Sequence, residues 1–178
     1  ILLYTKNAIG YENLLYISTL IQEKSVLTID SLVKYSQGLF YVFVDYNFKD
    51  LQYCNEILDK FNKNEMEYYI GLSNIKDEQN IELYNTYDKQ LFVPIARTRY
   101  LNKEDKIVLE ALLKIGENKE QIVSDSYVLN KKELEERIYD KNIFNNLDVL
   151  VNKINFEMEH RNIKLPIYPN ATNSKTYL

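Results

Sequence analysis

Histidine and cysteine, which commonly serve as metal ligands or in catalysis, occur once each in this sequence, as His160 and Cys54. A structural zinc site takes about four such ligands, so the sequence excludes one. A single cysteine also excludes an intrachain disulfide and is typical of a reducing compartment such as the cytoplasm. His160 lies in the polar run 157–161. We therefore interpret it as a surface residue and not as the base of a Ser-His-Asp triad.

Paired carboxylates could serve in acid–base chemistry, and two pairs stand out, Glu104-Asp105 and Glu135-Glu136. Each falls near the start or on the exposed face of a predicted helix, where acidic side chains are stabilised by the helix dipole. We interpret both pairs as solvated faces. The 4 glycines are scattered without the spacing of a phosphate-binding loop. The 16 tyrosines are spread through strands and helices alike, which favours packing over base stacking.

The overall charge limits the classes of partner. A net charge of -4 and a pI near 5.2 argue against a chain that binds nucleic acid on its own, because phosphates require a basic face. No stretch is long and apolar enough to span a bilayer. The 178 residues fit one domain, and the apolar run at 1–5, which lacks an initiator Met, is expected to be a core strand within a longer protein.

The periodicity of apolar residues predicts alternating strands and helices. Strands are expected over 1–5, 39–44, 68–72 and 91–96, with Pro94 indicating an edge position or a strand start. Helices are expected over 11–23, from Thr28 to 33, over 48–61, over 77–87, from Asn102 to Gly116, from Asn130 to 138, and over 143–158. This alternation predicts an α/β fold with a largely parallel sheet or barrel.

In such folds the functional site lies beyond the C-terminal ends of the strands. Four segments follow predicted strands and could hold a site: Asn7, Asp45 to Asn47, Ser73 to Asn74, and Arg97 to Arg99.

Several segments, in order, resemble one protein family. They are Leu2 to Ser18, Val93 to Asp105 followed by Leu113 to Lys119, Ser126 to Leu134, and Leu165 to Pro169 followed by Thr176 to Leu178. They are similar to the motifs "AKN…GY-NLL-LSS", "VATNDVHYL-PED…L-IG-GK", "FYLKSPEEM" and "LP-FP…EYL". These motifs belong to the PHP domain (polymerase and histidinol phosphatase) of bacterial DNA polymerase III alpha subunits. The chain resembles the low-GC Gram-positive type without its N-terminal part.

The resemblance implies a partial, distorted βα barrel with mostly parallel strands and outer helices. Residues 1–164 would form the PHP domain and residues 165–178 a linker toward the polymerase core. In the family, His, Asp and Glu side chains hold a cluster of metal ions. Here Arg97 stands where a ligand Asp is expected and Arg99 where a ligand His is expected. A guanidinium has no lone pair to donate to a metal, so the resemblance implies no metal and no catalytic residue in this chain.

The resemblance therefore implies a structural and docking module of a replicative DNA polymerase, itself inactive and without a cofactor. DNA synthesis would belong to the polymerase core of the parent protein, with Mg²⁺. The expected partners are the rest of the alpha subunit, other replisome proteins such as an exonuclease subunit, and DNA only through the parent. One alternative is a metal-dependent phosphoesterase or proofreading 3′–5′ exonuclease. Another is an unrelated α/β binding protein whose similarity is due to chance.

Two hypotheses address the role of Arg97 and Arg99. In the first, they pair with acids at the mouth of the barrel, such as Asp45, and replace the charge of the missing metal. In the second, they hold a phosphate or an oxygen of the DNA backbone.

Overall fold

The computed structural model describes residues 1–24, 26–45, 48, 50–116 and 126–158. His160, the predicted linker over 165–178 and the motifs within it lie outside this part of the chain.

Four strands form one mixed sheet in the order β1-β2-β3-β4. They are β1 (Leu2–Thr5), β2 (Leu39–Val44), β3 (Tyr68–Leu72) and β4 (Phe92–Pro94). All four predicted strands are present, although β4 is shorter than expected, and Pro94 does lie in an edge strand. The α/β class is confirmed, and the sheet remains open within the described residues.

The prediction of parallel strands is right for β2–β3 and β3–β4 but wrong for β1, which pairs antiparallel with β2. Periodicity carries no information on strand direction, because side chains alternate in the same way in both arrangements. One consequence is that Asn7, which follows β1, lies at the opposite end of the sheet from Asp45 and Ser73. Asn7 therefore does not belong to a site at the C-terminal ends of β2 and β3.

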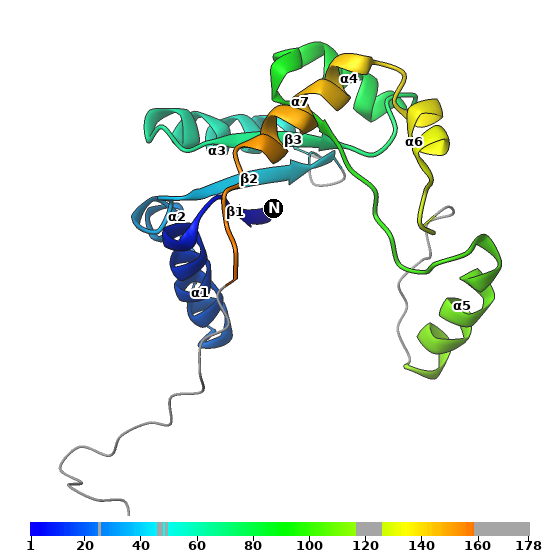
Figure 1. Ribbon diagram of the computed structural model, residues 1–178, viewed down its shortest axis with the longest axis horizontal. Coiled ribbons are helices and arrows are strands. Elements are labelled where there is room, and N and C mark those ends of the chain that lie inside the picture. Colours follow the sequence, from blue (N-terminus) through cyan, green and yellow to red (C-terminus); the bar gives the residue numbers. More distant parts are fainter. Residues whose placement is uncertain (25, 46–47, 49, 117–125, 159–178) are drawn as a thin grey trace, which may run out of the picture.

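Within the described residues the strands are joined and flanked by helices α1 to α7 (Figure 1). They are α1 (Ala8–Gln22), α2 (Ile29–Lys34), α3 (Leu51–Lys63), α4 (Glu78–Thr86), α5 (Lys106–Ile115), α6 (Lys131–Arg137) and α7 (Lys141–Asn152). Short 3-10 turns cover Lys89–Leu91 and Lys103–Asp105.

Polar side chains set where several of these helices begin. Asn7 accepts a hydrogen bond from the Gly10 backbone N–H at 3.0 Å, so α1 begins before the predicted residue 11. The predicted caps Thr28 and Asn130 are confirmed, and Asn130 shares a capping box with Glu133. The last helix ends at Asn152 instead of at 158.

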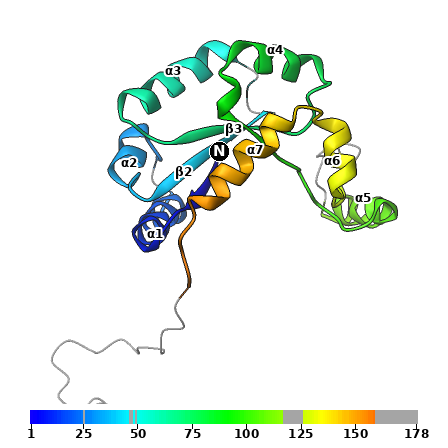
Figure 2. The same cartoon turned by 45° about the horizontal axis from the view of Figure 1, so that its top comes forward.

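The two faces of the sheet are covered unequally. On one face, alternate side chains such as Tyr41, Ile70 and Phe92 pack against the helices α1 to α4 and the start of α7 in the larger core cluster. On the other face, Phe40, Val42, Tyr69 and Val93 form a smaller cluster with Leu150 of α7. Figure 2 shows α7 lying along this second face while α3 and α4 lie on the other. Among the described residues, fewer side chains therefore cover the second face than the first.

The segment after β4 leaves the sheet and carries α5 and α6 out to one side (Figures 1 and 2). The predicted apolar face of α5 is present, but none of its residues is buried. Ile107, Leu112 and Ile115 are between 59% and 80% exposed. No helix among the described residues has the length and apolar character needed to cross a membrane.

Candidate functional site

The C-terminal ends of β2, β3 and β4 border a cleft of about 1000 Å³, which we call the C-terminal cleft. It is lined by the strand-end residues Asp45, Ser73 and Arg97, by Asn80 of α4, and by Glu133 and Arg137 of α6, together with apolar side chains of β1. Three of the four predicted segments therefore contribute to one cleft, as expected for the ends of neighbouring parallel strands.

The polar centre of the C-terminal cleft is Asp45, whose side chain is 3% exposed. Its Oδ2 atom accepts hydrogen bonds from the Ser73 backbone N–H at 2.7 Å and from the Ser73 hydroxyl at 2.5 Å. It also accepts one from Nδ2 of the buried Asn80 at 3.0 Å. Asn80 Nδ2 donates to the backbone oxygen of Asn74 as well, at 2.7 Å.

This arrangement ties three segments to one carboxylate. The ends of β2 and β3 and the first turns of α4 all meet at Asp45, because each supplies the acceptor or a donor. Hydrogen bonds to a charged group are stronger than those between neutral groups. We therefore interpret Asp45 as the residue that fixes the wall of the cleft, with Ser73 and Asn80 held in place by it.

Of the two arginines singled out by the sequence, the structure brings one into the cleft. Arg97 is exposed and lines it. Arg99 is half-buried and does not line it, and the Arg99 backbone N–H donates to the Ser126 backbone oxygen at 2.7 Å. Arg97 and Asp45 thus border the same space, and the ion pair expected between the arginines and such an acid remains a prediction.

Gly71 of β3 is packed closely against Ile95 and Val42. A Cβ there would lie 3.1 Å from Cγ2 of Ile95 and 3.2 Å from Cγ1 of Val42. Both contacts are tighter than ordinary van der Waals contact, so apolar side chains occupy the space that a longer side chain at position 71 would need. Among the residues that the structure describes, no group of three or more His, Cys, Asp or Glu side chains could hold a metal ion.

The prediction of solvated acidic pairs is confirmed for Glu135-Glu136, whereas Asp105 is half-buried and belongs to a helix cap. Asp105 accepts from the Asn102 backbone N–H at 2.8 Å at a helix start. Glu135 is exposed and lies 3.8 Å from Lys131 on the same helix. Glu136 is also exposed, although it borders the C-terminal cleft.

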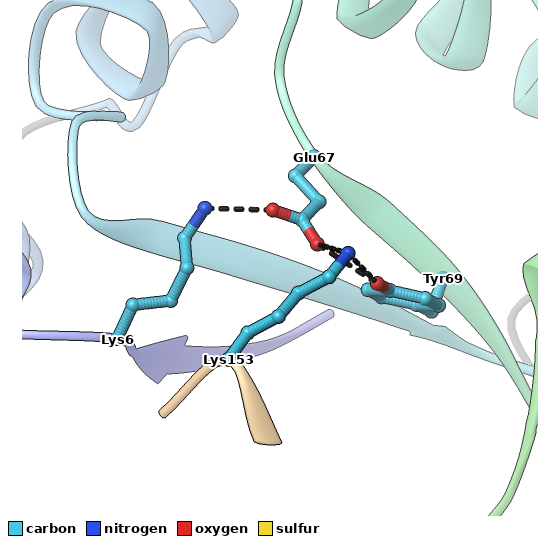
Figure 3. A network of polar contacts seen from close by, with 4 residues as sticks. All are labelled: Lys6, Glu67, Tyr69 and Lys153. Carbon is cyan, nitrogen blue, oxygen red and sulfur yellow. Dashed lines mark hydrogen bonds and ion pairs between the residues drawn. The ribbon is translucent and has the colours of Figure 1, made fainter. Parts of the chain in front are cut away.

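A second polar network lies at the other end of the sheet, and sequence reasoning missed it (Figure 3). Glu67, just before β3, accepts from Nζ of Lys6 at 2.7 Å and from Nζ of Lys153 at 2.8 Å. The Tyr69 hydroxyl donates to Glu67 at 2.8 Å, and Lys153 donates to the Tyr69 oxygen at 2.9 Å. We call these four residues the Glu67 clamp. It joins the ends of β1 and α7 to the start of β3.

The charges of the Glu67 clamp shift its titration. Burial alone would raise the pKa of the Glu67 carboxyl, but hydrogen bonds from Lys153, Lys6 and Tyr69 outweigh it and lower the pKa to about 2. The hydrogen bond to Glu67 raises the pKa of Lys153. Burial raises the pKa of Tyr69, so its hydroxyl stays protonated and acts as a donor. The clamp is therefore a structural ion cluster and not an activated nucleophile.

No local signal could have predicted this clamp. Lys6 and Glu67 are 61 positions apart, and Glu67 and Lys153 are 86 positions apart. Lysines and glutamates are common on surfaces, so only the pairing of β1, β2 and β3 brings these three side chains together.

Comparison with known proteins adds no identification. No model of a known protein family matches the chain, and no curated protein matches its sequence significantly. The fold and the two polar networks therefore define the molecule as an α/β protein with a four-stranded mixed sheet and a cleft at the C-terminal ends of its parallel strands.

Proposed function

We propose that the chain is the PHP domain of a bacterial replicative DNA polymerase alpha subunit, and that it has lost its metal ligands. In this proposal it acts as a structural and docking module in DNA replication. The observation that carries the proposal is the place of Arg97, which lines the cleft at the C-terminal ends of the parallel strands. Sites of βα folds lie at these ends, and the family resemblance puts a ligand aspartate at this position.

Electrostatics explains why Arg97 is incompatible with the family's metal cluster. The guanidinium group stays protonated at any physiological pH and repels divalent cations. Its nitrogens cannot act as ligands. In the family, the strand that matches residues 69–72 often carries a glutamate, and this chain has none there, which supports the same conclusion.

The proposal also assigns roles to the two segments of the chain and to the polymerase core of the parent protein. The mixed sheet and its helices would form part of a distorted barrel over residues 1–164, and residues 165–178 would lead toward the polymerase core. That core would carry out synthesis with Mg²⁺ in the cytoplasm. The module would contact the rest of the alpha subunit and other replisome proteins, including an exonuclease subunit. It would meet DNA only through the parent protein.

The first experiment tests the loss of metal chemistry. The purified chain is incubated with Zn²⁺ or Mn²⁺, desalted and analysed for metal content. It is then assayed with p-nitrophenyl phosphate and with the 3′ end of single-stranded DNA. We expect no stoichiometric metal and no hydrolysis. Bound metal together with hydrolysis would overturn the proposal in favour of a phosphoesterase or exonuclease.

A matched variant makes this experiment sharper. The double substitution Arg97→Asp and Arg99→His restores the ligand types that the family resemblance places there. A higher Zn²⁺ affinity than that of the unsubstituted chain would support the alignment of Arg97 and Arg99 with the ligand positions of the family. The control exchanges the cleft residue Arg137 for Asp, which changes the charge in the same cleft without restoring a ligand position. An equal increase in both variants would contradict the assignment of Arg97.

A second experiment tests membership of a polymerase. Antibodies raised against the chain are used to precipitate the native protein from the cells that produce it. We expect a polypeptide much larger than 21.2 kDa with Mg²⁺-dependent DNA synthesis activity. A precipitated protein without synthesis activity would contradict the assignment to a polymerase.

A further inference from the structure

The chain leaves α7 through a short segment, residues 153–158, that runs beside α1 (Figure 1). We call this segment the strap. The Asn155 backbone N–H donates to the backbone oxygen of Lys6 at 2.8 Å, just before α1 begins. The Phe156 ring stacks on Tyr11, near the start of α1, with ring centroids 5.1 Å apart. Two consecutive residues therefore hold the strap against the N-terminal part of α1.

The helix α1 carries more apolar side chains than its contacts bury. Of its 15 residues, Gly10 and Ile17 are the buried ones. Ile21 is 57% exposed, and Val26, shortly after the end of the helix, is 85% exposed. We call Ile21 and Val26 the α1 end patch. A helix that is apolar on most sides is usually covered by another segment, and within the described residues this part of α1 is poorly covered.

The strap leads toward the α1 end patch. It runs from the start of α1 toward the C-terminal end of that helix in Figure 1, and Figure 2 again places it beside α1. From Tyr11 to Ile21 the helix rises by about 15 Å. An extended chain covers about 3.3 Å per residue, so the seven steps from Phe156 to Ile163 cover about 23 Å. Ile163 is therefore within reach of the α1 end patch.

The sequence beyond the strap suits such a position. The apolar residues Ile163, Leu165 and Ile167 alternate with Lys164 and Pro166. In an extended chain this alternation puts the three apolar side chains on one side. Pro166 favours an extended backbone at the residue before it and has no N–H for a sheet ladder. The sequence thus favours an extended segment with one apolar side, which a helix surface can cover.

We propose that residues 163–167 pack on the α1 end patch, so that the chain continues along α1 past the strap. The occupant is this segment and not a second copy, because a tether of a few residues supplies it at about millimolar effective concentration. Residues 117–125 are joined to α5 and α6, which both views place on the opposite side of the molecule from α1. The inference does not depend on membership of a polymerase, so each can fail without the other.

The test is disulfide formation within the full chain. One variant combines Ile21→Cys with Ile163→Cys, and the matched control combines Leu112→Cys with Ile163→Cys. Leu112 is also more than half exposed but lies on α5. Cys54 is buried and is kept in both variants. The rate of closure under a glutathione buffer is measured by mass spectrometry of the digested protein. Because a disulfide needs Cα atoms within about 7 Å, we expect the first pair to close about tenfold faster or more.

NMR of the methyl groups of Ile21 and Val26 identifies the occupant independently. Their signals should shift in Ile163→Ser and stay unchanged in Ile122→Ser. A shift in Ile122→Ser alone would overturn the proposal in favour of the segment after α5. Disulfides between two chains, at a rate that rises with protein concentration, would overturn it in favour of a second copy. Equal rates of closure in the two cysteine pairs would also contradict it.

The role of the strap as an anchor is tested in the same cysteine pair. Phe156→Ala removes the ring that stacks on Tyr11, so we expect closure between positions 21 and 163 to slow by about threefold or more. Met158→Ala is the matched control, since Met158 belongs to the strap but is 66% exposed. Equal rates in the two variants would show that Phe156 does not hold the segment on α1.

Discussion

At both ends of the sheet, polar side chains hold the ends of the strands in place, but the two ends use different interactions. At the end where β1 stops and β3 begins, the Glu67 clamp joins two lysines to one carboxylate, and α1 lies directly against the turn before β2. At the other end, Asp45 accepts hydrogen bonds from Ser73 and Asn80, and a cleft stays open beside it. We call the first the closed end and the second the open end.

The difference shows how much room each end leaves for a ligand or partner. At the closed end, charge pairs and backbone contacts join distant segments, and the hollow beside Glu67, Tyr69 and Lys153 measures about 630 Å³, which is smaller than the cleft at the open end. At the open end, hydrogen bonds to the Asp45 carboxylate hold the strand ends in place without filling the cleft. The segment that carries α5 and α6 leads away from the sheet (Figure 2). Substitutions at the two ends should therefore affect stability and binding differently.

The largest effect is expected at the closed end from Gly10→Ala. A Cβ at this position would lie 1.9 Å from the backbone oxygen of Gly38, so α1 must move away from β2. We expect a loss of about 3 kcal/mol or more in the free energy of unfolding. Denaturant unfolding followed by circular dichroism measures it. The control is Gly116→Ala, where the nearest atom to the new Cβ is 3.5 Å away, and a similar loss there would contradict the explanation.

At the open end, Asp45→Ala should cost about 2–3 kcal/mol of folding stability, because it leaves the donors of Ser73 and the buried Asn80 without their acceptor. The same denaturant titration measures it. Glu136→Ala is the matched control, since Glu136 lines the same cleft but is exposed. If the two variants lose equal stability, Asp45 does not fix the strand ends.

Glu67→Gln tests the ionic part of the closed end. The amide keeps the shape but cannot pair with Lys6 and Lys153, so we expect a loss of about 1–2 kcal/mol. Glu65→Gln, two residues earlier and exposed, should change stability by less than about 0.5 kcal/mol. Equal values for both variants would show that the clamp adds nothing.

The pH dependence of the same clamp gives an independent measurement. The pKa of Glu67 falls from the ordinary value of 4.5 to about 2 in the folded protein. A lowered pKa means that its contribution is complete above pH 4.5 and is lost as the pH falls toward 2. The free energy of unfolding should therefore fall more steeply over this interval in the unsubstituted chain than in Glu67→Gln. If the free energies of the two proteins fall in parallel with pH, the ionic role of the clamp is contradicted.

The smallest effect is expected beyond the open end, on α5. Leu112 is 59% exposed, so Leu112→Ala should change the free energy of unfolding by less than about 0.5 kcal/mol. Leu58 of α3 is 3% exposed, and Leu58→Ala should cost about 2–5 kcal/mol. A large loss in Leu112→Ala would show that α5 packs against another surface in solution.

Much of the local structure followed from the sequence. The strand over 39–44 was predicted with its observed bounds, because a β-branched and aromatic run after Gly38 leaves little choice. The caps Thr28 and Asn130 and the helix end at Gly116 were also confirmed, since each depends on a side chain or glycine close by in the chain. The predicted end of α7 and the predicted direction of β1 were wrong, because neither depends on local propensity.

The candidate site was partly predictable for a related reason. The rule that strand ends carry sites placed Asp45, Ser73 and Arg97 together, and the structure puts all three on one cleft. The rule failed for Asn7, because it assumes that all strands run in the same direction. Asn80 was not singled out, since an asparagine within a helix gives no sign that it will point at a buried carboxylate.

The sequence alone therefore determined the α/β class, the residues that cap the helices and the types of side chain at the strand ends. These depend on interactions between residues near one another in the chain. Only the tertiary structure decided that β1 runs antiparallel to β2 and that Lys6 and Lys153 meet at Glu67. Those features depend on contacts between segments tens of residues apart, and their geometry is set by how the whole sheet packs against its helices.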